Sequence, residues 1–347
     1  MMVRDQLPWA LPFGRRLRHL AVAISAALTL LGALHEGWAA TTVQFVTYTG
    51  GLGDWSPYVG DDLGYFKDEG IDFQMHTFQN PGDIATAIIS GRGDIATSSL
   101  PLVIAGVLSG TPIKLISATQ KATPGGGYNN WWGALPNAGI AKPADLRGKK
   151  VAIYAQNSLA QAVTRSILAS AGIKVGEYQE IALPFPQAYT ALESGLTDVS
   201  LFIEPFYTRA NQLSRSKYGK PLTVVYTYLN AFPNGLDLSG MFANANFLVR
   251  RPEAVRAFLR ATTRAAKWGN SHPDELKKII AKYAGVSYED IKDAIPSEMS
   301  EDGKFIPGML DEMQRLMIEY KTIPNLTSPL PESAFVDLSY LPAPRRP

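Results

Sequence analysis

Cysteine is absent from the 347 residues of the chain. Its absence excludes disulfide bonds, a cysteine nucleophile, thiolate-bound zinc and iron–sulfur clusters. It also leaves no cysteine that could carry a lipid anchor. The fold must therefore be stabilised by burial of apolar side chains, and the chain beyond residue 39 is long enough for two domains that each bury a core.

Histidine is scarce, with four in the chain, and only His76 and His272 lie beyond residue 39. No H-E-x-x-H, G-x-S-x-G or clustered carboxylate pattern accompanies them. Gly51 and Gly53 follow an expected strand, but the third glycine of a dinucleotide-binding fingerprint is missing. We therefore expect no catalytic residue, no metal site and no cofactor.

An excess of charge of one sign is also missing. The chain has 33 Lys and Arg against 31 Asp and Glu, and the two signs balance once residues 1–39 are left out. A neutral chain without basic runs argues against nucleic acid or an anionic membrane surface as a partner.

One long apolar run is present, Leu20–Leu34, and it follows Arg15, Arg16 and Arg18. The run is short for a membrane span, and small side chains before residue 40 suit cleavage by a signal peptidase. We expect residues 1–39 to be a secretory signal peptide and the remainder to be periplasmic. The alternative is an N-terminal membrane anchor.

One pattern occurs twice. Residues 90–101 read SGRGDIATSSLP and residues 194–205 read SGLTDVSLFIEP, so Ser-Gly, Asp, a β-branched residue and Pro recur at the same spacing. Solenoid repeats have periods of about 20 to 50 residues, whereas one copy in roughly a hundred residues indicates two similar lobes. We expect each copy to form a helix end, a tight glycine turn, a short strand and a helix start.

Strand and helix patterns alternate along the chain. Strand patterns at 41–50, 71–78 and 114–120 alternate with helix patterns, and the cycle restarts at Lys149. This alternation is typical of an α/β fold with mostly parallel sheets and helices on both faces.

Two loop-rich stretches with Gly and Pro, 136–143 and 230–240, are the expected crossings between the lobes. The amphipathic helices of the C-terminal third are expected to pack on the first lobe. The expected division is residues 1–39 for the signal peptide, 40–138 with 241–347 for lobe I, and 139–240 for lobe II.

Polar residues cluster where expected strands give way to helices. In open α/β sheets ligands bind at such turns, and the free amides of helix N-termini favour anions. Each residue alone is equally well explained as an ordinary helix cap, but their clustering on both lobes favours a ligand cleft. These residues are Asp54, Ser56, Thr97, Ser98, Ser99, Asn157, Ser158 and Glu204.

Glu204 stands between an apolar strand pattern and Pro205, where an unpaired buried carboxylate would be costly. It must meet either a cation of the protein or a donor on a ligand. Aromatic residues near the turns could stack on a ligand ring or pack in the core, and two adjacent tryptophans of one strand cannot both face the same core. These aromatics are Trp55, Trp131, Trp132, Phe185, Phe206 and Tyr207.

Four stretches together resemble a known family. They are GYFKDEGID at 64–72, AIISGRGDIATSS at 87–99, KPADLRGKKVAI at 142–153 and ALESGLTDVSLFIEP at 191–205. In order and spacing they are similar to the exported substrate-binding proteins of ABC importers of the nitrate, sulfonate and taurine type, a family that includes binders of thiamine-pyrimidine precursors. The resemblance covers most of the chain beyond the signal peptide.

The resemblance implies a two-lobed, type 2 periplasmic-binding fold whose lobes close like a hinged clamp on a ligand in the cleft between them. It implies a small-molecule ligand and an ABC permease in the membrane as partners, and we expect a monomer. Carried onto this chain, it places ligand contacts at Gly51, Asp54, Trp55, Thr97, Ser98, Ser99, Gln120, Asn157, Ser158 and Glu204.

The expected function is therefore solute binding for import and not catalysis, with a small organic anion as ligand, a sulfonate or a carboxylate, aromatic ones included. No Arg lies in the turns, so an anion would be held by amides and hydroxyls, with Lys121 as the nearby cation. The alternatives are a binder of a thiamine-pyrimidine precursor, a ligand sensor coupled to a membrane receptor, and a pyrimidine-synthase-like enzyme. The enzymes of this kind need iron and a cysteine-rich motif, and this chain has no cysteine.

Overall fold

The computed structural model describes residues 40–48, 53–78 and 81–343. The expected signal peptide at 1–39 and Gly51 lie outside these residues. Strands and helices alternate along the described chain, which confirms the predicted α/β fold. No described helix is long and apolar enough to cross a membrane.

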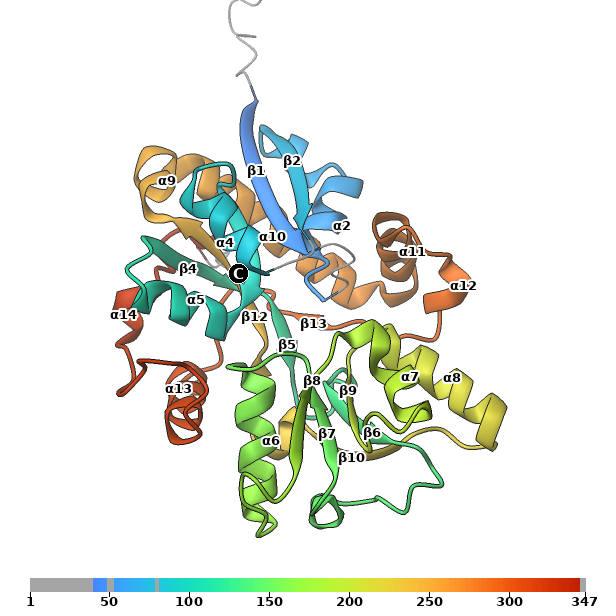
Figure 1. Ribbon diagram of the computed structural model, residues 1–347. Coiled ribbons are helices and arrows are strands. Elements are labelled where there is room, and N and C mark those ends of the chain that lie inside the picture. The colour runs from blue at the N-terminus through green and yellow to red at the C-terminus, as the bar shows by residue number, and fades with distance from the viewer. Residues whose placement is uncertain (1–39, 49–52, 79–80, 344–347) are drawn as a thin grey trace, which may run out of the picture. The chain divides into compact units, whose positions relative to one another are not determined.

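The first sheet has the strand order β2-β1-β3-β12-β4 (Figure 1). Its strands are β1 (Thr41–Tyr48), β2 (Ile71–Phe78), β3 (Ile95–Ser99), β4 (Ile113–Ala118) and β12 (Ser239–Asn244). Strands β1, β2 and β3 run parallel, whereas β12 is antiparallel to both β3 and β4. The sequence predicted mostly parallel sheets, and β12 departs from that direction because it enters the sheet on the return of the chain from the second sheet.

Helices cover both faces of this sheet, as predicted. They are α2 (Ser56–Asp62), α3 (Tyr65–Asp68), α4 (Pro81–Ile89), α5 (Leu100–Leu108) and α10 (Pro252–Ser271). Neighbouring residues of β1 point to opposite faces, so Phe45 joins the core under α2, α3 and α10, whereas Val46 joins the core under α4 and α5. The sheet with these helices is lobe I.

The second sheet repeats this plan. Its strands are β6 (Trp131–Ala134), β7 (Lys150–Ile153), β8 (Gln179–Ala182), β9 (Ser200–Phe202) and β10 (Thr223–Thr227), and its helices are α6 (Leu159–Ser170), α7 (Ala188–Glu193) and α8 (Phe206–Tyr218). Strands β7 and β8 are parallel, a parallel bridge joins Val151 to Val199 ahead of β9, and β6 is antiparallel to β9 and β10. The order β8-β7-β9-β6-β10 therefore matches that of the first sheet, and this group is lobe II.

Both copies of the repeated sequence begin with the same turn. Gly91 follows α4 with φ +72°, and Gly195 follows α7 with φ +70°. Glycine adopts this left-handed conformation without steric cost and commonly ends helices in this way. Each turn lets the chain leave its helix and enter the next strand at once.

The aspartate of each copy ties its strand to the first strand of the same lobe. The Asp94 carboxylate accepts the backbone N–H of Gln44 at 2.8 Å, and the Asp94 N–H donates to the Gln44 carbonyl at 2.8 Å. The Asp198 carboxylate accepts the N–H of Lys150 at 2.7 Å, and the Asp198 N–H donates to the Lys150 carbonyl at 2.8 Å. The two stretches thus recur because each lobe needs the same link between two parallel strands.

The two crossings between the lobes lie side by side in a small sheet with the order β11-β5-β13. It consists of β5 (Gln120–Ala122), β11 (Leu236–Asp237) and β13 (Glu298–Met299), all antiparallel. The second crossing falls within the predicted stretch 230–240. The lobe boundaries remain a proposal, and because β6 pairs with strands of lobe II, we propose that the first crossing precedes Trp131 instead of lying at 136–143.

The helices after β12 contact both lobes. They are α9 (Ala245–Arg250), α10, α11 (Pro273–Ala284), α12 (Tyr288–Ile291), α13 (Met309–Glu319) and α14 (Glu332–Phe335). Helices α10 and α11 pack on α2 of lobe I, as expected. Helix α13 instead packs on α6 of lobe II, where the Arg165 guanidinium donates to the Tyr320 carbonyl at 2.9 Å.

The strand links make a testable prediction. Asp94→Ala and Asp198→Ala should each lower the free energy of unfolding by about 1–3 kcal/mol, because each leaves a backbone N–H without its acceptor. The losses should add in the double variant, since the two links lie in different sheets. Asp94→Asn, which keeps an acceptor oxygen, is the matched control in urea unfolding. Equal losses for the Asn and Ala variants would contradict the role of the link.

Candidate functional site

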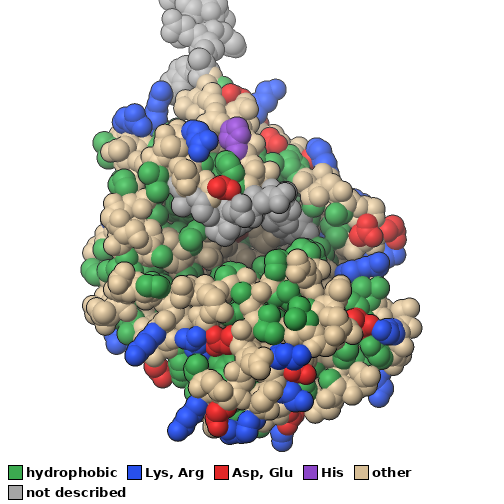
Figure 2. All heavy atoms as spheres, viewed as in Figure 1, with side chains coloured by type: hydrophobic (Ala, Val, Ile, Leu, Met, Phe, Trp, Pro, Cys, Tyr) green, Lys and Arg blue, Asp and Glu red, His purple; other side chains and the backbone are tan. Residues whose placement is uncertain are grey.

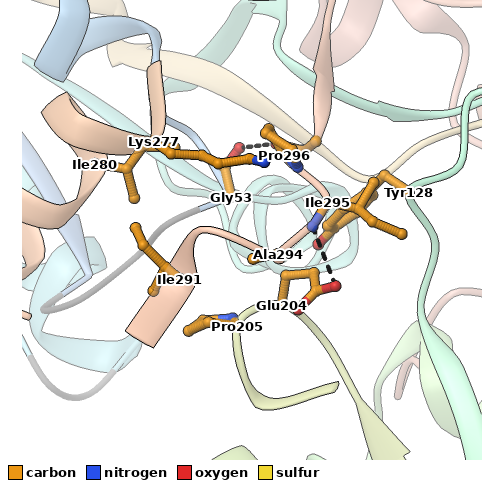
Figure 3. Close-up of a pocket in the computed structure, with 11 residues that line it drawn as sticks. Gly53, Tyr128, Glu204, Pro205, Lys277, Ile280, Ile291, Ala294, Ile295 and Pro296 are labelled. Carbon is orange, nitrogen blue, oxygen red and sulfur yellow. Dashed lines mark hydrogen bonds between the residues drawn. The ribbon is translucent and has the colours of Figure 1, made fainter. Parts of the chain in front are cut away.

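A pocket lies where lobe I, lobe II and the segment after α12 meet (Figure 3). The space-filling view is hollowed between the half that carries β1 and β2 and the half that carries β7 and β8 (Figure 2). The pocket volume is about 20 Å³, enough for one water molecule, so a larger guest requires the walls to move apart. Its lining residues are Gly53, Tyr128, Glu204, Pro205, Lys277, Ile280, Ile291, Ala294, Ile295, Pro296 and Ser297.

Glu204 is the acidic residue of this pocket. It is 7% exposed, follows β9 and is joined to Pro205 by a cis peptide bond. Its carboxylate accepts the N–H and hydroxyl of Thr208, at 3.1 and 2.9 Å, and the N–H of Ile295 at 3.3 Å. Burial raises the pKa of Glu204, and the hydrogen bonds from Thr208 and Ile295 oppose that rise. The contact of Glu204 with Ile295 joins lobe II to the C-terminal half of the chain.

The charges of two nearby carboxylates act on Tyr128. It is 5% exposed and lines the pocket. Burial raises the pKa of Tyr128, and the negative charges of Glu204 and, to a smaller extent, Asp54 raise it further. The phenol therefore stays protonated and can donate to an acceptor. Trp131 meets Tyr128 edge-on at 5.7 Å and stacks on Tyr207 at 4.2 Å, which makes one wall of this region aromatic.

Asp54 is the second carboxylate near Tyr128. Its Oδ1 accepts the hydroxyls of Thr119, at 2.6 Å, and Ser239, at 2.7 Å. Removal from water raises the pKa of Asp54, and the hydroxyls of Thr119, Ser239 and Thr97 oppose the rise. The structure thus brings Asp54 and Thr97 together and adds Thr119 and Ser239, which the sequence analysis did not name.

The remaining predicted residues of lobe I differ in their environments. Gln120 packs so closely on Gly53 that a Cβ at residue 53 would lie 2.8 Å from the Gln120 amide nitrogen. Ser98 is buried at 1%, and Ser99 precedes α5 without a side-chain cap bond. Trp55 does not line the pocket: it is fully buried, and its indole N–H donates to the carbonyl of the lining residue Ser297 at 2.9 Å.

In lobe II, Asn157 and Ser158 belong to a network at the start of α6 and not to the pocket lining. Ser158 caps the helix by accepting the N–H of Gln161 at 3.3 Å, and its hydroxyl donates to the Ala155 carbonyl at 2.7 Å. Asn157 has a left-handed φ of +55°, and its N–H donates to the Gln161 side chain at 2.9 Å. The Gln161 amide in turn donates to Glu180 at 2.6 Å.

The two adjacent tryptophans point to opposite faces of their strand, β6. Trp132 is fully buried, stacks on Tyr226 at 4.6 Å and donates to the Ala152 carbonyl at 3.1 Å. Trp131 points to the other face, toward Tyr128 and Tyr207. Phe185 pairs with Tyr154 at 5.6 Å. Of the aromatics that the sequence named, Trp131 contacts the pocket residue Tyr128, and Tyr207 stacks on Trp131.

The segment after α12 supplies residues that sequence reasoning missed. Asp293 accepts from Thr208 through its carbonyl and from Gln212 through its carboxylate, both at 3.4 Å. Ser297 donates to the Gly53 carbonyl at 2.6 Å. The segment 293–297 thus bridges the lobes over the pocket. Its short sequence, DAIPS, carries no recognisable motif, so only its position in the fold reveals this role.

Lys277 of α11 also lines the pocket. Its ammonium donates to the Lys292 carbonyl at 2.6 Å and lies 3.6 Å from Asp274. Lys277 attracts the charge of Glu204 and lowers its pKa, although less than the hydrogen bonds do. Among the described residues no group of three His, Cys, Asp or Glu could hold a metal ion.

Comparison with known proteins places the chain in a family. A family model described as NMT1/THI5 like matches residues 56–276, more than half of the chain. The chain belongs to the NMT1/THI5-like family. A curated member named 4-amino-5-hydroxymethyl-2-methylpyrimidine phosphate synthase, from Candida albicans, is 23% identical over 240 residues, which are 63% of this chain and 64% of that protein. The chain thus spans less than two thirds of that relative.

Solved structures share the fold of this NMT1/THI5-like protein. The periplasmic aliphatic sulphonate binding protein SsuA from Escherichia coli is 15% identical with a TM-score of 0.66, covering 82% of this chain and 89% of SsuA. The periplasmic nitrate-binding protein NrtA from Synechocystis is 16% identical with a TM-score of 0.67, covering 87% of each chain. The two-lobed periplasmic-binding fold that the sequence predicted is therefore confirmed.

The helix-cap geometry predicts how much Ser158 contributes to the stability of the protein. Ser158→Ala should lower the free energy of unfolding by about 0.5–2 kcal/mol, because α6 loses its N-cap acceptor. Asn157→Gly should change stability less, since glycine adopts a left-handed φ freely. Thermal or urea unfolding of the protein without added ligand checks both. Unchanged stability of Ser158→Ala together with weaker ligand binding would return Ser158 to the ligand site.

Proposed function

We propose that the protein is the periplasmic solute-binding component of an ABC importer. It binds one small solute where the two lobes meet, closes around it by motion at the β5–β11 crossings, and delivers it to a membrane permease as a monomer. The fold shared with SsuA and NrtA supports the class, and a pocket at the lobe junction supports the mode of binding. Residues 1–39 would direct export as a signal peptide and be removed from the mature protein.

The charges of the pocket favour a ligand that donates hydrogen bonds. Glu204 lines the pocket, and both it and Asp54 act on Tyr128 with negative charge. In a poorly solvated site such carboxylates repel an anion and attract an amino group or a ring N–H. The aromatic wall of Trp131 and Tyr207 suits a planar ring. We therefore propose an aminopyrimidine of the kind in the name of the Candida albicans relative as the best-supported ligand class.

A small organic anion is the second candidate, as the sequence analysis expected. Lys277 lines the pocket and offers an ammonium, and the serine and threonine hydroxyls near Asp54 are donors. SsuA and NrtA are named for sulphonate and nitrate, although at 15% and 16% identity their likeness reaches the fold alone. Binding of an anion would require the carboxyl of Glu204 to be protonated.

Binding without catalysis is part of the proposal. The Candida albicans relative is named as a synthase, so an enzyme remains the competing class. His76 of β2 contacts Gln44 of β1, and His272 stacks on Trp268, and neither histidine lines the pocket. A sensor coupled to a membrane receptor would use the same pocket and differ only in its partner.

The ligand class can be tested by thermal shift of the protein with 4-amino-5-hydroxymethyl-2-methylpyrimidine, ethanesulfonate, taurine and nitrate. A ligand at a hundred times its dissociation constant adds about 2.7 kcal/mol of stability. We expect the pyrimidine to raise the unfolding midpoint. Glu204→Gln should weaken its binding about 10- to 100-fold, because a hydrogen bond to a charged group contributes about 1.5–3 kcal/mol.

The control is Glu275→Gln, which removes the same charge from an exposed position of α11, the helix that carries Lys277. It should leave the affinity unchanged. A midpoint raised by ethanesulfonate or nitrate, with binding strengthened by Glu204→Gln, would favour the anion instead. Turnover of the pyrimidine or a requirement for iron would contradict the binding role.

A further inference from the structure

Asp237 is a buried carboxyl in the second crossing between the lobes. It lies in β11 opposite Lys121 of β5, and its side chain is fully buried. Its Oδ2 accepts the N–H of Ile306 at 2.7 Å. Its Oδ1 has no hydrogen-bond partner among the described residues. Buried carboxylate oxygens are costly to leave unpaired, so this position requires an explanation.

Charged groups surround Asp237, but among the described residues none forms an ion pair with it. Lys121 on β5 lowers its pKa, and Asp302 in the turn after β13 raises it. Glu298 of β13 stands opposite Lys121, and Lys304 lies 4.0 Å from Asp302, so both nearby lysines have acidic neighbours. In the described chain no ion pair joins Lys121 to Asp237. Burial dominates and raises the pKa of Asp237 to about 6.

We propose that Asp237 couples proton binding to the hinge: the protonated carboxyl favours the packed arrangement of β11 against β5, and its ionisation favours arrangements that expose Oδ1 to water or to Lys121. The β11–β5 pair joins the two lobes, so the lobe arrangement shifts with pH. This inference rests on the proposed lobe closure and not on the identity of the ligand.

The sign of the effect follows from proton linkage. The carboxyl holds its proton up to about pH 6 in the described arrangement, whereas an exposed Asp releases it near 3.8. Raising the pH through this window therefore disfavours the packed hinge and lowers the free energy of unfolding. The difference between the two pKa values limits the change in the hinge equilibrium to about 100-fold.

The absence of cysteine allows a direct test. Val249→Cys on α9 and Val175→Cys after α6, 79% and 61% exposed, give one spin-labelled pair with a label on each lobe. Electron–electron distance distributions are recorded without ligand from pH 4.5 to 7.5. We expect the distribution to change with a midpoint near pH 6, and Asp237→Asn to hold the low-pH distribution throughout.

Two charge variants sharpen the test. Asp302→Asn should move the midpoint to lower pH, and Lys121→Gln should move it to higher pH, because their charges act on Asp237 in opposite directions. The Asp237 carboxyl carbon, followed by NMR in the unsubstituted chain, should titrate with the same midpoint even if Asp237→Asn does not fold. Three results would overturn the inference. The distance distribution does not change with pH, it still changes with pH in Asp237→Asn, or the Asp237 carboxyl titrates near pH 4. No outcome depends on finding a ligand.

Discussion

The buried carboxylate of Glu204 is the constraint on which the pocket depends. A charge removed from water must be compensated, and here the compensation comes from Thr208 of its own lobe and from the N–H of Ile295, which belongs to the C-terminal half. One side chain therefore links segments that lie far apart in the sequence. These donors are backbone and hydroxyl groups, and the ammonium of Lys277 lowers the pKa of Glu204 less than they do. We therefore propose that the carboxylate attracts hydrogen-bond donors on a ligand.

The repeated sequence explains why the two lobes are alike in plan but differ in chemistry. Asp94 and Asp198 perform the same strand link in each lobe. Six residues further on, the copies diverge: lobe I has Leu100, fully buried in its core, where lobe II has Glu204. The shared residues of the repeat thus maintain the fold, and one of the positions at which the copies differ supplies the acidic group of the pocket.

The sequence was informative where the determining contacts are local. Glycine turns, helix caps and the repeat predicted the α/β alternation, which the structure confirms. Trp55 shows the limit, because a tryptophan beside a polar turn looks the same whether it meets a ligand or packs on α10. Lys277 and segment 293–297 were missed since only the return of the C-terminal helices brings them to Glu204. The proposed shift of the first crossing to a point before Trp131 rests on pairing of that strand with strands much later in the chain, which local sequence does not show.

The most direct measurement is a crystal structure of the protein with 4-amino-5-hydroxymethyl-2-methylpyrimidine. The account predicts that the ring lies near Tyr128 and Trp131, with an amino or ring N–H within hydrogen-bonding distance, about 2.7–3.2 Å, of the Glu204 carboxylate. A ligand held instead by the backbone amides at the start of α6, with Glu204 bonded to Thr208 and Ile295 alone, would contradict it.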